Sequence, residues 1–206
     1  EFGDGTAGIV SIHISSKISG TVNVANIARK AMDNSYQIGI IDSKFNSAGL
    51  GLVVIAAARA AVRGATFDEV VKEANLAISE VKMFGFFSTM KYLARSGRVN
   101  KTIAAASQVL NVMPLLTFRD GEIVRAGLVR SVHKGMEKIH EFVKNTARVR
   151  EIIISHSHDL ENAHILKNRL GEFIAGEKIM VSELGAGLGV HGGPGVLLAA
   201  VRSSLS

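Results

Sequence analysis

Two turns rich in glycine and hydroxyl groups carry residue types that can bind an anion. In the first, Ser15–Thr21, a strand-like run ends in hydroxyls and Gly20 before a helical pattern begins. Ser19 lies at or near the expected N-cap, where free backbone N–H groups and the positive end of the helix dipole attract negative charge. Taken alone, this local sequence favours a simple capping role for Ser19 over ligand binding.

The second turn is Gly185–Gly195, with His191 at its mouth, where the imidazole can donate a hydrogen bond to an oxyanion. A run this rich in glycine costs backbone entropy, which favours a functional role over filler. Proline suits the first turn of a helix, so we expect a helix from Pro194 to Arg202.

Part of the second turn, Gly187–Gly192, matches the G-x-G-x-x-G pattern of dinucleotide sites. That pattern belongs at the first strand–helix turn, with an acidic residue about twenty positions later, and this sequence ends before such a position. We therefore expect no dinucleotide. A wider nucleotide- or phosphate-binding role for residues 185–195 stays open as a third hypothesis.

A histidine cluster, His156, His158 and His164 with Asp159, raises the question of a metal site. Metal sites usually need three protein ligands with a supporting shell of hydrogen bonds. The simpler interpretation is a strand end followed by Asp159 near a helix N-cap, and we expect no metal.

A serine and a histidine also permit hydrolysis, so Ser19 and His191 could form the centre of a serine esterase or thioesterase. The G-x-S-x-G pattern is absent around Ser19, and the sequence shows no carboxylate to orient His191. We expect no catalytic residue and keep the esterase as the alternative.

The composition narrows the class of partner. Lys and Arg exceed Asp and Glu by 24 − 18 = 6, which favours anionic partners. No block of five like charges and no interleaved aromatics appear, so we expect no nucleic acid. A basic middle section could dock an acidic partner protein. Its members are Arg95, Arg98, Lys101, Arg125 and Arg130.

Cysteine is absent, which excludes disulfides and thiolate chemistry. The longest apolar run, Leu50–Ala58, is too short to span a bilayer, and no signal peptide opens the chain. We expect a cytoplasmic protein with no membrane span, while allowing transient membrane contact.

The first half of the chain predicts an α/β fold. Ile9–Ile14, Thr21–Met32 and Gln37–Asp42 form a strand–helix–strand pattern typical of a parallel sheet. Ser47–Val62 is apolar nearly all round, as in a helix buried on several sides. Thr66 and Glu69 form a capping box for a helix whose apolar face runs from Phe67 to Val81.

The second half predicts another α/β layer with an antiparallel pair. The expected strand Phe84–Phe87 is followed by a polar break, Tyr92–Asn100. The hairpin turn Arg119–Gly121 joins the next two strands. The expected elements after the break are strands Val112–Phe118 and Glu122–Val129, helix Val132–Lys144, strand Val149–His156, helix Leu160–Leu170 and strand Lys178–Ser182.

These features resemble the DegV family in their order along almost the whole chain. The matching stretches are Ser11–Thr21, Ile41–Ser43, Ala94–Arg98, the Pro114–Arg125 hairpin and His191–Gly195. The resemblance implies two α/β domains with a fatty acid in a tunnel between them. In this chain the domains would be residues 1–88, a parallel-sheet domain, and residues 89–206, a mixed-sheet domain whose turn 185–195 faces the ligand.

The resemblance also implies the site and the partner. Ser19 and His191 would contact the carboxylate of a long-chain fatty acid, with Gly20, Thr21, Gly192 and Gly193 in the same turns. Bacterial members present the bound acid to a separate fatty-acid kinase, which makes an acyl phosphate for phospholipid synthesis. The carrier itself performs no chemistry and needs no cofactor. Arg98 and Arg130 are the candidates to face the kinase.

Two departures from the family pattern stand out. The family's opening strands and a Thr-Ser-Gln-Pro-like turn that contacts the carboxylate are not in this sequence, so we expect an incomplete first domain. Gly192 stands where a threonine is common, which removes a hydrogen-bond donor.

Overall fold

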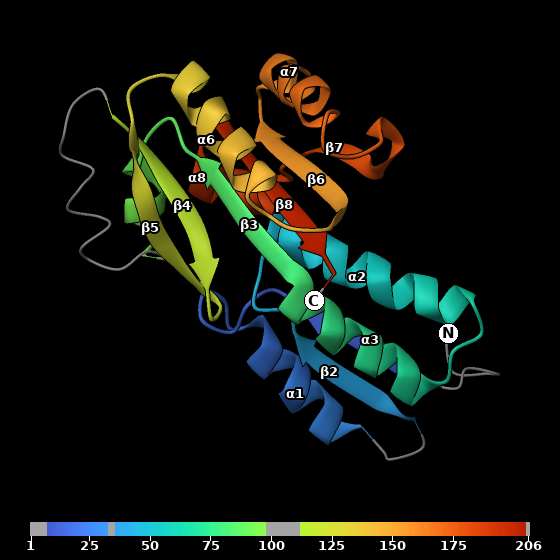
Figure 1. Cartoon of the computed structure of the whole chain (residues 1–206). Coiled ribbons are helices and arrows are strands. Elements are labelled where there is room, and N and C mark those ends of the chain that lie inside the picture. The colour runs from blue at the N-terminus through green and yellow to red at the C-terminus, as the bar shows by residue number, and fades with distance from the viewer. Residues whose placement is uncertain (1–7, 33–35, 98–111, 205–206) are drawn as a thin grey trace.

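The computed structural model describes residues 8–32, 36–97 and 112–204, which form a mixed α/β fold with two sheets (Figure 1). The smaller sheet is a parallel pair, β1 (Ile9–His13) and β2 (Ile38–Asp42), joined through α1 (Thr21–Ala31). This arrangement confirms the predicted strand–helix–strand unit and its parallel pairing.

The larger sheet of the described residues has six strands in the order β5-β4-β3-β8-β6-β7. Only β6 and β7 pair in parallel there, and the other neighbours are antiparallel, so the sheet is mixed as predicted. Its strands are β3 (Val81–Phe86), β4 (Met113–Arg119), β5 (Glu122–Val129), β6 (Val149–Ser157), β7 (Ile179–Glu183) and β8 (Val196–Ser203).

Helices cover both faces of the larger sheet (Figure 1). One face packs against α6 (Val132–Lys144) and α7 (Leu160–Leu170). The other packs against α2 (Ser47–Val62), which also contacts β1 and α3 (Phe67–Glu80) and so lies between the two sheets. This position explains why α2 is apolar nearly all round.

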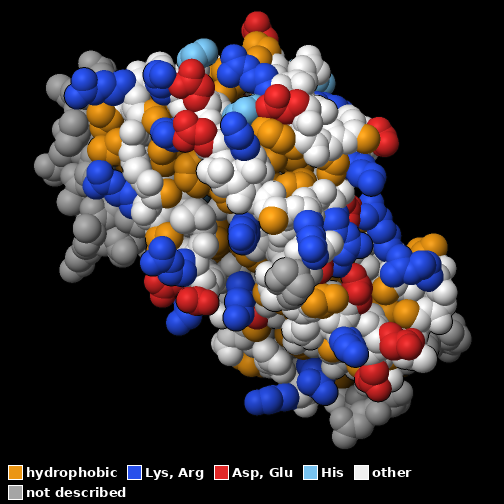
Figure 2. All heavy atoms as spheres, in the orientation of Figure 1, with side chains coloured by type: hydrophobic (Ala, Val, Ile, Leu, Met, Phe, Trp, Pro, Cys, Tyr) orange, Lys and Arg blue, Asp and Glu red, His pale blue; other side chains and the backbone are white. Residues whose placement is uncertain are grey.

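Charged side chains lie mostly on the surface, where Figure 2 shows Lys and Arg interspersed with Asp and Glu over the visible face. A buried exception joins β8 to α3. Arg202, 3% exposed, donates from Nε to Glu80 over 2.7 Å and from an Nη to Glu73 over 2.7 Å. Hydrogen-bonded pairing of this kind is what a buried charge requires.

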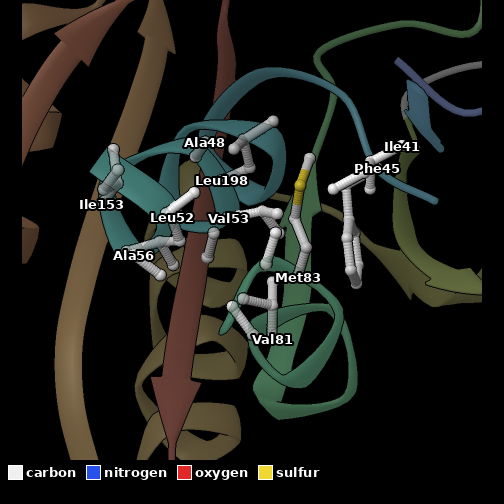
Figure 3. Close-up of a cluster of buried hydrophobic side chains, with 14 of the residues drawn as sticks. Ile41, Phe45, Ala48, Leu52, Val53, Ala56, Val81, Met83, Ile153 and Leu198 are labelled. Atoms are coloured by element: carbon white, nitrogen blue, oxygen red, sulfur yellow. The ribbon is translucent and has the colours of Figure 1, made fainter. Parts of the chain in front are cut away.

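The core has two main parts, one on each face of the larger sheet, because successive residues of a strand point to opposite faces. Met83 and Leu198 pack toward α2 and Phe45, in the cluster of Figure 3. Their sequence neighbours Phe84 and Leu197 pack toward α6 and α7. The cavity described below lies on the first of these faces.

The predicted helix from Pro194 to Arg202 is wrong, because this segment forms strand β8. Every residue of β8 is buried, and the strand lies between β3 and β6 with helices over both faces. A continuous apolar run suits a strand buried on both faces as well as a buried helix, so hydrophobic periodicity does not separate the two.

Three smaller differences follow from local chain geometry. The capping box of Thr66 and Glu69 is present, but α3 ends at Glu80, and Val81 begins β3 directly. The predicted polar break includes a short helix, α4 (Lys91–Ser96), and its later residues lie outside the described part. The turn 185–195 contains a second short helix, α8 (Ala186–Gly192).

The division into domains 1–88 and 89–206 stays a prediction. The two sheets do separate the first strands from the rest. However, β3 falls within residues 1–88 and is hydrogen-bonded to β4 and β8 in the larger sheet.

Candidate ligand-binding site

A cavity of about 360 Å³ lies against the larger sheet, on the face covered by α2. It brings together the two turns that the sequence singled out. Ser19 and Thr21 line it from the start of α1, and His191 and Gly192 line it from α8. These residues are about 170 positions apart in the chain, so only the fold brings them together.

Apolar side chains make up most of the cavity wall. They come from the loop before α1, from β3 and the residue after it, from β4, β5 and β8, from α4, and from α8 and the turn that leads into it. The residues whose apolar side chains are available for this wall are Ile14, Ile18, Met83, Phe87, Leu93, Leu116, Phe118, Ile123, Leu184, Leu188 and Leu198. Phe84 also borders the cavity, but its ring stacks on Phe142 toward α6. No Asp, Glu, Lys or Arg belongs to the described residues that line the cavity. The site therefore offers an apolar interior with a few neutral polar groups.

The hydroxyl groups of Ser19 and Thr21 form a pair with a separation of 2.7 Å between their oxygens. The Ser19 oxygen also accepts a hydrogen bond from the backbone N–H of Thr21 over 3.2 Å. Whichever hydroxyl donates within the pair, the other keeps its hydrogen free for a third partner. The pair therefore supplies one hydroxyl donor at the cavity.

Gly20, not Ser19, is the N-cap of α1, and a glycine has no side chain that could make the capping hydrogen bond. Ser19 precedes the cap by one residue, as the expectation "at or near the N-cap" allows. No acidic residue lies in the first turn of α1, so no side chain there repels an anion from the positive end of the helix dipole.

His191 lies in the last turn of α8. Because no helix begins at Pro194, the expected second helix N-terminus is absent here, and β8 follows instead. The imidazole is half-buried, lines the cavity and has no hydrogen bond to another described residue. It is free to donate to a ligand.

The glycines of the two turns have different roles. Gly192 lines the cavity and is buried. Gly193 does not line it and has φ of 71°, and a Cβ there would come within 2.2 Å of the Tyr92 ring. Glycine is therefore required at this position for α8 to pack against α4. Gly20 is exposed and is not part of the cavity wall.

Two cavity residues that the sequence analysis missed, Asn46 and Ser47, lie at the start of α2. Asn46 is the N-cap, but its side chain makes no capping hydrogen bond. Its Oδ1 is buried and has no hydrogen-bond partner among the described residues. A buried acceptor of this kind normally meets a donor from water or a ligand. The sequence feature that could have identified Asn46 is an asparagine directly before an apolar helical run.

The histidine cluster near β6 forms no metal site in the described part of the chain. His156 is buried, and its Nδ1 accepts a hydrogen bond from the backbone N–H of Asp159 over 3.3 Å. Asp159 is the N-cap of α7, although its carboxylate bonds to the Asn162 amide instead of capping. The strand-end interpretation of this cluster agrees with these contacts.

The esterase alternative lacks its geometry in the described residues. Ser19 bonds to Thr21 and not to His191, and His191 has no carboxylate partner there. A serine nucleophile needs a histidine base that a third group orients.

Of the two arginines predicted to contact a partner protein, the structure describes only one. Arg98 lies outside the described residues. Arg130 is exposed, directly after β5, and has no ion-pair partner in the described part. Separately, none of the helices in the described ranges has the length and apolar character needed to cross a bilayer.

Comparison with known families gives a match over nearly the whole chain. A family model described as "Uncharacterised protein, DegV family" matches residues 1–202. A DegV domain-containing protein of Caldanaerobacter subterraneus is 33% identical over 189 residues. That alignment covers 90% of this chain and 67% of the relative.

Solved structures share the fold. A fatty-acid-binding DegV family protein from Thermus thermophilus matches with a TM-score of 0.84 and 25% identity, over 98% of this chain and 72% of that protein. The Fatty Acid Kinase (Fak) B3 protein of Streptococcus pneumoniae, loaded with linoleic acid, matches with a TM-score of 0.89 and 20% identity. It covers 98% of this chain and 73% of that protein.

Proposed function

This chain belongs to the DegV family, and from that premise we propose that it binds a long-chain fatty acid and catalyses no reaction itself. The Thermus thermophilus relative is described as fatty-acid-binding, and the Streptococcus pneumoniae protein carries linoleic acid. Both support the same ligand class for this chain.

The observation that carries the proposal is the cavity itself. It combines a mostly aliphatic wall with neutral polar groups that converge from the two turns. An acyl chain gains about 0.8 kcal/mol for each CH₂ that it buries. A carboxylate that enters such a cavity without hydrogen bonds pays a large desolvation cost, so the polar groups are needed as well.

In the proposed complex, the carboxylate contacts the two turns. The Ser19–Thr21 hydroxyl pair donates its one free hydrogen, and the His191 imidazole donates another. Gly192 adds no side chain to this part of the wall, so the head group can approach the backbone. Gly20 and Gly193 shape the turns without lining the cavity.

Neutral donors also suit a carrier that must give up its ligand. A bidentate arginine would hold the carboxylate strongly, whereas a hydroxyl and an imidazole release it more easily. We propose that the carrier works in the cytoplasm and presents the head group to a fatty-acid kinase. The resulting acyl phosphate would then serve phospholipid synthesis.

The exposed Arg130 and the unplaced Arg98 are the proposed contacts for the kinase. Surface cations of this kind steer an acidic partner and raise its association rate. We further propose that residues 1–88 and 89–206 act as the two domains between which the ligand lies.

A direct titration tests this function. Protein stripped of lipid is titrated with myristic acid, which has fourteen carbons, and, in parallel, with an alkane of equal length. We expect one saturable site for the acid and at least tenfold weaker binding of the alkane, because only the acid satisfies the polar groups. Equal binding of both ligands, or none of the acid, would refute the proposal.

A further inference from the structure

Phe118 lines this cavity and also lines a second cavity of about 410 Å³. Phe118 is the one described residue that both cavities share. The second cavity lies between β2, α3 and the β4–β5 turn. Its other lining residues are Asp42, Lys44, Phe45, Asn75, Ile78, Ser79, Val81, Asp120 and Gly121.

The Phe118 ring packs against a buried aromatic neighbour. Its centroid lies 5.7 Å from that of Phe45, at an interplanar angle of 51°. Phe45 is 8% exposed and belongs to the buried cluster of Figure 3, with Met83 and Leu198. Behind it, a Cβ on Gly49 would lie 2.8 Å from the Phe45 Cγ, so the backbone of α2 presses directly on that ring.

The two cavities differ in the charge of the residues that line them. The first cavity has no charged lining residue in the described part, whereas the second has Asp42, Lys44 and Asp120. A methyl end that passed Phe118 would meet charged groups and their water. Phe118 therefore blocks an acyl chain by its volume and by the polar surface behind it.

The polar rim determines the orientation of the ligand in the cavity. Thr21 is exposed, so the hydroxyl pair lies where the cavity meets solvent, while Met83 and Leu198 form its buried floor. A fatty acid whose carboxylate binds at this rim extends its acyl chain toward the buried floor and toward Phe118. A cavity of about 150 Å³ holds the six carbons of benzene, so 360 Å³ holds roughly fourteen carbons.

We propose that Phe118 sets the length of the acyl chain this protein accepts, with the limit near fourteen carbons. This inference rests on the proposed fatty-acid binding and adds the residue that selects among fatty acids. Without the Phe118 ring, the two cavities join and the chain can extend past the wall.

The test is a series of saturated fatty acids from ten to twenty carbons, titrated into lipid-stripped protein. For the unaltered protein, affinity should rise about fourfold for each added CH₂ and then stop rising near fourteen carbons. Phe118→Ala should move this break to longer chains, with at least tenfold tighter binding of the eighteen-carbon acid and little change for ten carbons. Phe118→Trp should move the break to shorter chains.

Two further variants keep the test decisive. Phe118→Leu preserves most of the packing if the alanine variant does not fold, and it should shift the break by a smaller amount. Phe173→Ala is the matched control, because Phe173 is also half-buried against an aromatic neighbour, His140, but lies away from the cavity. It should follow the unaltered protein.

The outcomes separate the two claims. An affinity that rises unbroken to twenty carbons, or a break that no Phe118 variant moves, overturns the role of Phe118 while fatty-acid binding stands. Failure of every chain length to bind overturns the proposed function, and this inference with it.

Discussion

The buried hydroxyl of Ser15 donates a 2.7 Å hydrogen bond to the backbone carbonyl oxygen of Gly121, 106 residues later in the chain. Ser15 begins the turn that carries Ser19, and Gly121 lies in the hairpin that follows Phe118. This bond therefore ties the proposed head-group turn to the strand that carries the proposed wall of the acyl cavity. The Gly121 backbone also packs close to Lys17.

Replacing Ser15 by alanine should destabilise the protein by about 1–3 kcal/mol, because the Gly121 carbonyl would be left buried without its partner. The free energy of unfolding in urea measures this. Ser79→Ala is the control, since that hydroxyl is exposed on α3 and bonds only within its helix. Its effect should stay within about 0.5 kcal/mol. Equal effects of the two changes would show that the Ser15 bond contributes nothing.

Because the Ser19 and Thr21 hydroxyls share one free hydrogen, we expect changes at these two residues to have strongly non-additive effects on fatty-acid binding. Ser19→Ala leaves the Thr21 hydroxyl free to donate, and Thr21→Val leaves the Ser19 hydroxyl free to donate. Each single change should weaken fatty-acid binding by only a few fold, whereas the double change should weaken it by roughly tenfold or more, at about 1.5–3 kcal/mol for a bond to a charged group. A double-mutant cycle of dissociation constants measures the coupling. Simple additivity would contradict the shared donor.

His191→Ala should reduce affinity for a fatty acid by roughly tenfold or more, because it removes a hydrogen bond to the carboxylate. Titration of lipid-stripped protein measures the change. Val190→Ala is the control on the same helix, where the side chain is 66% exposed and does not line the cavity. If both variants bind alike, His191 does not contact the head group.

Asn46→Asp should weaken binding more than Asn46→Ala, because it places a carboxylate in a cavity without a cation among its described lining residues. The weakening should shrink as the pH is lowered and the introduced group takes up a proton. Asn168→Asp, exposed on α7, provides a control with the same change of charge. Equal affinity of the two Asn46 variants across the pH range would place Asn46 away from the ligand.

The capping box of α3 gives a pH dependence of stability. The backbone N–H and the hydroxyl of Thr66 both donate to the Glu69 carboxylate, and they hold its pKa below the usual 4.5. Because the folded-state pKa is the lower one, this stabilisation is present above the unfolded pKa and is lost as the pH falls through the folded pKa.

Accordingly, Glu69→Gln should lower stability at neutral pH and make the fall between neutral and acid pH shallower. Unfolding free energies at several pH values measure this. The exposed Glu177→Gln should leave the profile unchanged. A Glu69→Gln profile parallel to that of the unaltered protein would rule out the linkage.

Local patterns in the sequence predict much of this fold. The helices Ser47–Val62, Val132–Lys144 and Leu160–Leu170 have the bounds that the sequence predicted. The hairpin turn follows its sequence too, with Asp120 and Gly121 at φ of 50° and 87°. Strand β8 was missed because Val196–Val201 is apolar without a period, and only the neighbours β3 and β6 decide that the segment is extended.

The site was predictable only in part, for a similar reason. Hydroxyl and imidazole groups within glycine-rich turns pointed to Ser19 and His191, because their residue types carry the chemistry. Phe118 gave no such signal, since a phenylalanine in a strand is normally part of the core. Its place between two cavities depends on Phe45 and Gly49, far away in sequence, and appears only in the folded chain.

Native mass spectrometry of the purified, non-denatured protein tests the central claim most directly. Lipid-stripped protein is mixed with equimolar saturated fatty acids of ten to twenty carbons and with one alkane. We predict one bound fatty acid per chain, released on denaturation, and no bound alkane. A protein that keeps its ligand-free mass in this mixture, while its melting curve shows it folded, would contradict the account.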